Sequence, residues 1–354
     1  MDIMAYLDAQ KQQIDTLIRR YLPQTMDAKE VEWLAGKPRF AHDREAIANS
    51  LLVPSWDLLN RGGKRWRPAL FLLLVEALGG DVNKVRDVAI LPELVHNGTL
   101  IIDDIEDGGE VRRGKPCLHK IYGIDIAINA GNFLYFHPLL TFAKQAGRFD
   151  DTTLRRAYEA YAQEMINVSI GQGTDIYWHK GKKSRISEEQ YLQMCAFKTG
   201  CLSRLAGRLA AIFAGADKAA EDKVGRFCES VGIAFQIQDD ILSATATGEF
   251  AKRKGYGDDI TEGKRSLLVI HALGKADPED RLRLLDILNR HTREEKAIAE
   301  ALAILKKYQS AEYAKRIART LVEDAWEALE PELDASHAKE LLASLVRFAT
   351  ERQI

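Results

Sequence analysis

Three aspartates lie close together in the segment LIIDDIEDGG, at Asp103, Asp104 and Asp107. On a helix, positions i and i+4 share a face, so Asp103 and Asp107 should project together with Asp104 beside them. Acids crowded at the C-terminal end of a helix repel one another and are disfavoured by its dipole. A hard divalent cation such as Mg²⁺, which prefers oxygen ligands and is often shared with substrate phosphates, would remove both penalties. A solvated acidic helix end explains this cluster equally well.

A second polar stripe lies in the segment VGIAFQIQDDILSATA, on a predicted helix that is otherwise mostly apolar. Its members share one face and are Gln236, Asp239, Asp240 and Ser243. Acids in so apolar a helix are costly unless they are paired or bound to metal. We therefore expect the two aspartate helices to face each other and to hold metal ions between them. A single buried ion pair is the alternative interpretation of the second stripe.

Basic residues that could complement a diphosphate occur in four places. These are RGGKRWRP from Arg61 to Pro68, the pair Arg112 and Arg113, Lys198 in KTG, and Lys254, Lys264 and Arg265 around GYGDDITEG. Arginine makes planar bidentate contacts to phosphate, whereas lysine acts as a point charge. Each place alone is typical of a charged surface. Together they indicate two anion sites around a metal cluster.

Composition excludes several classes of protein. The 354 residues include 50 Lys and Arg against 52 Asp and Glu, so the net charge of −2 gives no global field for binding nucleic acid. The four cysteines form no CxxC pair, which favours a reducing cytoplasm over a zinc or disulfide framework. The N-terminus lacks the pattern of a signal peptide. The longest strongly apolar run, Ala69 to Val75, is too short to span a bilayer. We expect a soluble, cytoplasmic protein without a transmembrane segment or nucleic-acid partner.

The residues that could do chemistry lie in a chain dominated by helical periodicity. The predicted helices cover 3–22, 43–60, 68–78, 84–107, 124–146, 151–178, 187–214, 218–247, 265–274, 278–290, 293–307, 310–329 and 336–352. Pro92 should kink the helix at 84–107 or mark its true start. Residues 108–119 are a Gly- and Pro-containing loop, and no segment alternates like a strand. We expect one all-α domain over 1–354, with a motif core at about 55–275 and C-terminal helices at 276–354.

Other known catalytic motifs are incomplete in this sequence or absent from it. Glu93-x-x-His96 matches half of a di-iron bundle motif, but none of the other seven histidines has Glu three residues earlier. The patterns GxSxG and Walker A are absent.

Taken in order, the motifs resemble those of trans-isoprenyl diphosphate synthases, the polyprenyl synthetase family. The resemblance covers roughly residues 55–275 and rests on GGKRWRP at 62–68, ELVH at 93–96, DDIED at 103–107, RRGKPCLH at 112–119, GQGTD at 171–175, KTG at 198–200, FQIQDD at 235–240 and KGYGDDITEGK at 254–264. It implies an all-α bundle around a central apolar cavity, a homodimer, and several Mg²⁺ ions that bridge a diphosphate.

The resemblance also implies roles for individual residues. The metal ligands would be Asp103 and Asp107, with Asp239 opposite, and Asp104 belongs to the same motif. The isopentenyl diphosphate site would comprise Lys64, Arg67, His96 and Arg113. The allylic diphosphate site would comprise Arg112, Lys198, Lys254 and Lys264, with Thr199 and Gln236 beside the allylic C1 and Asp175 orienting Lys198. Catalysis would depend on Asp103, Asp104, Asp107, Arg112, Lys198 and Asp239.

The implied reaction is head-to-tail condensation of isopentenyl diphosphate with an allylic diphosphate through ionisation, condensation and loss of a proton. One residue departs from the family pattern, because Ser243 stands where a third aspartate is usual. A neutral serine binds Mg²⁺ more weakly, so we expect the hydration of that metal to differ while activity survives. Two alternatives remain: a class I terpene cyclase, which needs no isopentenyl diphosphate site, and a non-catalytic partner subunit of a prenyl synthase.

Product length would be set on the N-terminal side of Asp103. Gly98 and Thr99 lie about one helical turn, roughly 6–7 Å, before it and are small. In the resembling family a bulky aromatic there stops growth early. The residues Phe133, Tyr135 and Phe136 are candidates for a lower floor. We expect a product of C20 or longer, with geranylgeranyl diphosphate as the first guess.

Overall fold

The computed structural model describes residues 3–25, 27–181, 183, 185–245 and 257–351. The all-α prediction is confirmed, since the described residues are mostly helical and their strands amount to one short hairpin. The chain divides into two compact units. The first unit is Met1–Ala160, Leu205–Glu221 and Asp334–Leu342, and the second is Tyr161–Arg204, Asp222–Leu333 and Ala343–Ile354. None of the described helices is long and apolar enough to cross a membrane.

The first unit contains the segment of the first aspartate cluster. Its elements are α1 (Ile3–Tyr21), α2 (Ala28–Ala35), α3 (Arg44–Ile47), α4 (Val53–Asn60), α5 (Trp66–Ala77), α6 (Val82–Val85), α7 (Ile90–Glu106), β1 (Val111–Arg112), β2 (Lys115–Pro116), α8 (Leu118–Tyr122), α9 (Ile124–Phe136) and α10 (Leu140–Ala143). A π-helical turn, Ala48–Leu52, joins α3 to α4, and 3₁₀ turns precede α7 and α10.

The second unit contains the second aspartate motif. Its elements are α12 (Glu188–Cys195), α16 (Asp258–Thr261), α17 (Leu267–Lys275), α18 (Pro278–Arg290), α19 (Glu295–Lys307) and α20 (Ser310–Leu329). Four helices have residues in both units: α11 (Asp151–His179), α13 (Cys201–Phe213), α14 (Lys218–Thr245) and α21 (His337–Glu351). A π-helical turn, Ala196–Gly200, joins α12 to α13.

Several predicted helices differ in detail from the observed ones. The predicted helix at 84–107 begins in fact at Ile90, so Pro92 lies in its first turn, where the missing N–H costs nothing. Helix α2 was not predicted, although Asp27 and Glu30 form a capping box at its start. The expected loop at 108–119 contains the antiparallel pair β1 and β2. The predicted helix at 124–146 is interrupted at Pro138 by a 3₁₀ turn.

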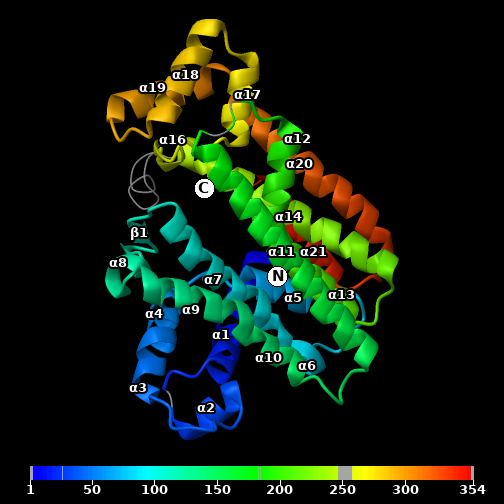
Figure 1. The fold of residues 1–354 in the computed structure, drawn as a ribbon. Helices are drawn as coiled ribbons and strands as arrows, with labels where there is room; N and C mark the ends of the chain where they lie inside the picture. Colours follow the sequence, from blue (N-terminus) through cyan, green and yellow to red (C-terminus); the bar gives the residue numbers. More distant parts are fainter. Residues whose placement is uncertain (1–2, 26, 182, 184, 246–256, 352–354) are drawn as a thin grey trace. The chain divides into compact units, whose positions relative to one another are not determined.

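The core of the first unit includes α5, where all residues from Pro68 to Val75 are buried. Burial of each large apolar side chain contributes about 1.5–3 kcal/mol. Helices α7 and α9 pack side by side (Figure 1). A Cβ on Gly98 would lie 2.8 Å from the carbonyl oxygen of Gly131, so this pair of glycines permits the close approach. The approach fixes α7, which bears the first aspartate cluster.

Candidate active site

The first aspartate cluster lies at the C-terminal end of α7, as predicted. Asp103 and Asp107 are half-buried, and Asp104 is buried. The Arg112 side chain returns to this cluster and donates to Asp104 Oδ1 from Nε at 2.8 Å and from Nη2. A weaker contact of 3.4 Å joins Arg112 Nη2 to Asp103 Oδ2. The arginine thus compensates part of the negative charge that crowds this helix end.

The β1–β2 hairpin positions Arg112. The Arg61 guanidinium donates to the carbonyl oxygens of Arg112 at 3.1 Å and Pro116 at 2.9 Å, which ties both strands to the end of α4. Burial opposes the charged form of Arg112, but the hydrogen bonds and charge of Asp104 raise the pKa of its guanidinium above its ordinary value. Arg112 therefore carries a permanent positive charge at the aspartate cluster.

A second group of cations surrounds His96 in the first unit. Arg113, next to Arg112 in the chain, donates instead to Asn97 Oδ1 at 3.2 Å and to the Leu58 carbonyl at 3.2 Å. Burial holds the pKa of His96 well below its ordinary value, and the nearby charges of Arg67 and Arg113 lower it further. His96 is therefore a neutral imidazole at pH 7 and can donate one hydrogen bond.

The remaining basic residues of this group come from the loop before α5 and from the first turn of that helix. Arg67 is buried, and its guanidinium lies over the Trp66 ring at 4.7 Å from the ring centroid. Lys64 is exposed. Within the first unit, Arg67, His96 and Arg113 thus form one basic group. The hydrogen bonds of this group are separate from those that join Arg112 to the aspartates.

In the second unit, Lys198 contacts Asp175. The Lys198 ammonium donates to Asp175 Oδ2 at 2.5 Å. Lys198 lies in the π-helical turn, a distortion frequently found at functional sites. Helix α11 approaches this turn so closely that a Cβ on Gly171 would lie 2.6 Å from the Phe197 carbonyl carbon. Because Asp175 lies one turn after Gly171, the close approach brings the carboxylate to the lysine.

A chain of polar contacts runs from the π-helical turn to the second aspartate motif. Thr199 Oγ1 donates to Gln236 Oε1 at 3.0 Å, and Gln236 Nε2 donates to Asp240 Oδ1 at 2.8 Å. The Tyr191 hydroxyl donates to Asp240 Oδ2 at 2.8 Å. The two aspartates of this motif therefore have different environments: Asp240 is buried among these donors, whereas Asp239 is exposed.

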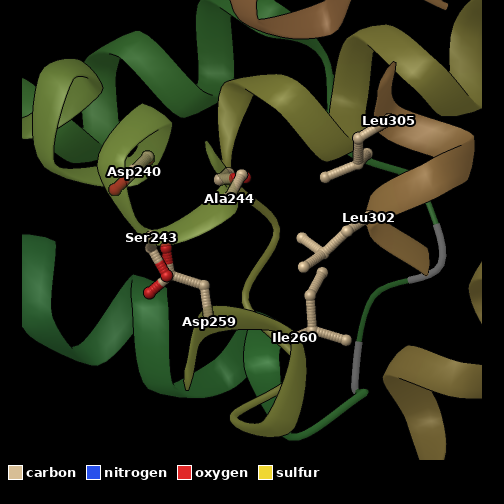
Figure 2. A pocket seen from close by; sticks show the side chains of 8 residues that line it. Asp240, Ser243, Ala244, Asp259, Ile260, Leu302 and Leu305 are labelled. Carbon is tan, nitrogen blue, oxygen red and sulfur yellow. The ribbon is translucent and has the colours of Figure 1, made fainter. Parts of the chain in front are cut away.

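A small pocket in the second unit lies beside Asp240. Ser243 and Asp259 line it together with Asp240, and the apolar side of its wall includes Leu302 and Leu305 (Figure 2). Burial raises the pKa of Asp240 to about 7, and the charge of Asp259 acts in the same direction. Ser243 stands where the motif led us to expect a third aspartate, but the Asp259 carboxylate from α16 lies in the same pocket.

The remaining basic residues of the second unit lie near α16. The Lys264 ammonium contacts Glu262 Oε2 at 2.5 Å and Asp259 Oδ1 at 3.7 Å. Lys254, the other lysine assigned to the allylic diphosphate, lies outside the described residues. His179, at the end of α11, is buried, and its Nδ1 makes no hydrogen bond with the described residues.

The residues assigned to product length lie on α7. Gly98 is buried against α9, where a Cβ would be 3.0 Å from the Tyr135 ring. Thr99 is half-buried, and its hydroxyl donates to the His96 carbonyl at 2.8 Å. Phe133 packs against His137 with ring centroids 5.0 Å apart, whereas Phe136 is exposed. Of the three floor candidates, Tyr135 is the one that contacts Gly98.

Sequence reasoning missed four residues of these networks. Tyr191 and Asn97 carry no motif of their own, and Glu93, although part of the ELVH motif, was assigned no role once the di-iron pattern was excluded. Asp259 was part of a recognised loop, but only the lysines of that loop were considered. The signal for Asn97 is its position four residues after Glu93 on the same helix face.

The donors of the aspartate cluster fit magnesium. Among the described residues, no three His, Cys, Asp or Glu side chains are grouped closely enough to hold a metal ion by themselves. Magnesium does not need such a cage, because it is usually bound through one or two carboxylates together with waters and substrate phosphates. Asp103 and Asp107 supply hard oxygen donors one helical turn apart, and Asp239 supplies an exposed carboxylate.

The fold and these clusters define an all-α protein with two acidic helix segments and separate groups of basic residues. A model of the family described as polyprenyl synthetase matches residues 49–305. A short chain isoprenyl diphosphate synthase of Methanothermobacter thermautotrophicus is 35% identical over 314 residues, which cover 88% of this chain and 94% of that protein. A geranylgeranyl pyrophosphate synthase of Dictyostelium discoideum is 34% identical over 287 residues, which cover 81% and 90%.

The fold agrees with these sequence matches. The crystal structure of a geranylgeranyl pyrophosphate synthetase from Pyrococcus horikoshii superposes with a TM-score of 0.84 at 31% identity, covering 99% of this chain and 98% of that one. The chain therefore belongs to the polyprenyl synthetase family, and it is a prenyltransferase of isoprenoid biosynthesis.

Proposed function

We propose that this protein condenses isopentenyl diphosphate head-to-tail with an allylic diphosphate and releases a trans-prenyl diphosphate of C20 or longer. The observation that carries the proposal is the divergence of two adjacent arginines. Arg112 contacts the aspartate cluster, whereas Arg113 contacts Asn97 beside His96. Two diphosphates need two cationic sites, and neighbouring residues of one hairpin supply a cation to each.

The allylic diphosphate is bound by Arg112, Lys198, Lys254 and Lys264. The isopentenyl diphosphate is bound by Lys64, Arg67, His96 and Arg113. Asp103, Asp107 and Asp239 hold magnesium, with Asp104 holding Arg112 in place. When bound, the metal supplies positive charge for the diphosphate that leaves the allylic carbon.

The side chains contribute to catalysis mainly by position and charge. Arg112 and Lys198 stabilise the negative charge that develops on the departing diphosphate oxygen. The allylic C–O bond breaks to leave a delocalised carbocation, which the isopentenyl double bond attacks at C1. A proton then leaves to the released diphosphate, so no protein base is required. Holding two anionic substrates with their carbons aligned supplies much of the rate.

The polar pair beside the allylic C1 contributes oxygen atoms. Gln236 uses Nε2 for Asp240 and accepts the Thr199 proton on Oε1, so its amide orientation is fixed. Thr199 Oγ1 and Gln236 Oε1 each keep lone-pair capacity beyond the hydrogen bond between them. We propose that these oxygens stabilise the allylic cation without forming a covalent bond to it.

Geranylgeranyl diphosphate is the proposed first product. A relative and a solved structure similar to this chain bear that product in their names. Gly98 and Thr99 are small, so no bulky aromatic lies one turn before Asp103. The chain would therefore grow past this point before it stops.

A product analysis tests this function. The purified protein is incubated with Mg²⁺, radiolabelled isopentenyl diphosphate and allylic primers of five, ten and fifteen carbons (C5, C10 and C15), and the products are separated by chain length. We expect incorporation of label into C20 or longer products. Cyclised products without label would instead indicate a terpene cyclase, and activity only after addition of another synthase would indicate a partner subunit.

A cytoplasmic homodimer is the proposed state of the protein. In the first unit, Ile124 and Ile128 are exposed one turn apart on α9, and in the second unit Ile166 and Ile170 are exposed one turn apart on α11. Contiguous exposed apolar surface can bury against a second copy, and we propose that these isoleucines contribute to such a contact. The four cysteines are buried thiols, which suits a reducing compartment. Sedimentation should show a dimer for the natural chain and a monomer for Ile128→Glu.

A further inference from the structure

A buried chain of polar side chains leads to Arg113 in the first unit. Arg65 Nη1 donates to Glu93 Oε1 at 2.8 Å, and both side chains are only 3% exposed. Arg65 Nη2 also donates to the Leu59 carbonyl at 2.9 Å. A buried ion pair of this kind is costly to break from one side, because the remaining charge is left without its partner. Glu93 is therefore held in one position by an arginine that is itself anchored.

Glu93 in turn fixes the side-chain amide of Asn97. Asn97 Nδ2 donates to the Glu93 carbonyl at 2.8 Å and to Glu93 Oε1 at 3.1 Å. Both acceptors lie on one residue, one turn earlier on α7. The two amide protons are thus engaged, and the amide cannot rotate by half a turn without placing its oxygen against two oxygens of Glu93. Asn97 Oδ1 must face the other way, toward Arg113.

Arg113 depends on this acceptor because its surroundings are cationic. Burial lowers the pKa of Arg113 to about 10, and the charges of Arg65, Arg112 and Arg61 lower it further, whereas Glu93 acts in the opposite direction. The guanidinium remains charged at pH 7, but its neighbours repel it. A fixed acceptor at 3.2 Å is therefore an interaction that holds its orientation.

The contacts of Arg113 leave one edge of the guanidinium for a ligand. Within the part of the chain that the structure describes, both of its hydrogen bonds use Nη1, to Asn97 and to the Leu58 carbonyl. Nη2 lies near the loop before α5, since a Cβ on Gly63 would be 3.5 Å from it. Lys64 follows Gly63 in that loop. Nη2 thus lies near the loop that supplies Lys64, another proposed ligand of isopentenyl diphosphate.

We propose that Asn97, fixed by Glu93, is a positioning residue that presents Arg113 to isopentenyl diphosphate and so sets the affinity for this substrate without setting that for the allylic one. The inference rests on the proposed function of Arg113. A guanidinium held by one edge loses little freedom when the other edge binds a phosphate, so the bond forms at lower entropic cost.

The experiment compares Michaelis constants for the two substrates in Asn97→Leu, which keeps the shape of the side chain but removes its donors and acceptor. We expect the KM for isopentenyl diphosphate to rise about tenfold, the change that corresponds to one hydrogen bond to a charged group. The KM for the allylic diphosphate should stay within about twofold. Equal changes in both constants, or none, would overturn the proposal.

A smaller polar variant covers the case in which Asn97→Leu does not fold. Asn97→Ser removes the amide oxygen that faces Arg113 and leaves a hydroxyl that can still donate to Glu93. The same rise in the KM for isopentenyl diphosphate is expected, and an unchanged KM in this variant would overturn the proposal.

Two controls separate the possible failures. Asn167→Leu removes a buried amide that donates to Glu164 at 3.1 Å in the second unit, and it should change neither KM. Arg113→Gln tests the proposed function itself. If Arg113→Gln leaves the KM for isopentenyl diphosphate unchanged, the assigned substrate site is wrong. If it raises this KM while Asn97→Leu does not, only the positioning role is wrong.

Discussion

The Lys198 ammonium and the Asp175 carboxylate form a hydrogen-bonded ion pair of 2.5 Å between a π-helical turn and the long helix α11. Both side chains are largely buried, so the pair is screened little by solvent. The lysine is therefore held in place before any diphosphate arrives. Such preorganisation is what an anion site requires if charge is to be stabilised as it develops.

Asp175→Asn should weaken binding of the allylic diphosphate, because the lysine loses the charge that orients it. We expect its KM to rise about tenfold, while the KM for isopentenyl diphosphate is unchanged. Steady-state kinetics with each substrate varied in turn measure both constants. Glu159→Gln, on an exposed part of the same helix, is the control and should change neither. An unaltered allylic KM in Asp175→Asn would contradict the orienting role.

Gly171→Ala should disturb the ion pair of Lys198 and Asp175 by displacing the backbone of α11. Its Cβ would lie 2.6 Å from the Phe197 carbonyl carbon, so α11 must move away from the π-helical turn. We expect a loss of about 1–3 kcal/mol in the free energy of unfolding and a raised allylic KM. Gly173→Ala is a matched control, because nothing lies within 4 Å of its Cβ. That variant should be stabilised by roughly 0.5–1 kcal/mol, since alanine favours helix. If Gly171→Ala and Gly173→Ala were equally stable in urea, this result would argue against the close approach of α11 to the π-helical turn.

His137 should make the protein sensitive to acid. Burial lowers its pKa to about 4, with Lys144 acting in the same direction. Because the folded pKa lies below the unfolded value of 6.5, the unfolded chain binds more protons in this window, and stability is lost as the pH falls from about 6.5 to 4. Between pH 7 and 4.5, the natural chain should lose roughly 2 kcal/mol more than His137→Leu in denaturant unfolding. Equal losses of unfolding free energy in the natural chain and in His137→Leu would exclude His137 as a source of acid sensitivity.

Thr99→Phe should shorten the product. The new ring would stand on α7 one turn before Asp103, where the growing chain is expected to pass, whereas Gly98 is already packed against α9. Chromatography of dephosphorylated products should show a shift to C15 or shorter chains. Leu100→Phe, on the neighbouring face of α7, is the control and should keep the original length. Identical product distributions in all three proteins would contradict the proposed direction of chain growth.

Asp103→Asn and Asp239→Asn should each raise the Mg²⁺ concentration needed for half-maximal binding of a non-reactive allylic diphosphate analogue, as measured by calorimetry. If both carboxylates serve the same diphosphate through its metals, the double variant should lose less than the sum of the two single losses. Fully additive losses would indicate that the two aspartates act on independent sites.

The sequence was sufficient to predict much of this protein because its helices and acids follow local rules. The helix predicted over 278–290 matches α18, which begins where a capping aspartate precedes a proline: Asp277 accepts from the Asp280 N–H, and Pro278 is the first helical residue. The position of Asp103 and Asp107 just before the expected loop at 108–119 likewise predicted that they lie at the C-terminal end of α7. Local spacing cannot predict a partner far along the chain, so Tyr191, which donates to Asp240, was not anticipated.

Long-range packing also explains the other differences. The π-helical turn at Lys198 lies against α11 at Gly171, a residue 27 positions earlier. Residues 108–119 contain Gly and Pro and were expected to be irregular, yet Arg61 ties two short strands together there. In both places a tertiary contact determines a local conformation that propensity alone leaves open.

The contact between Arg65 and Asp15 has a practical consequence for work with shortened proteins. Asp15 lies on α1, and its carboxylate accepts from Arg65 Nε at 2.9 Å. Truncation of the first helix to aid crystallisation would leave all proposed substrate ligands intact but would remove one of the two acids that hold Arg65. Kinetic constants from such a truncated protein would then describe a weakened isopentenyl diphosphate site. Inhibitor affinities measured with it would differ from those of the full-length protein.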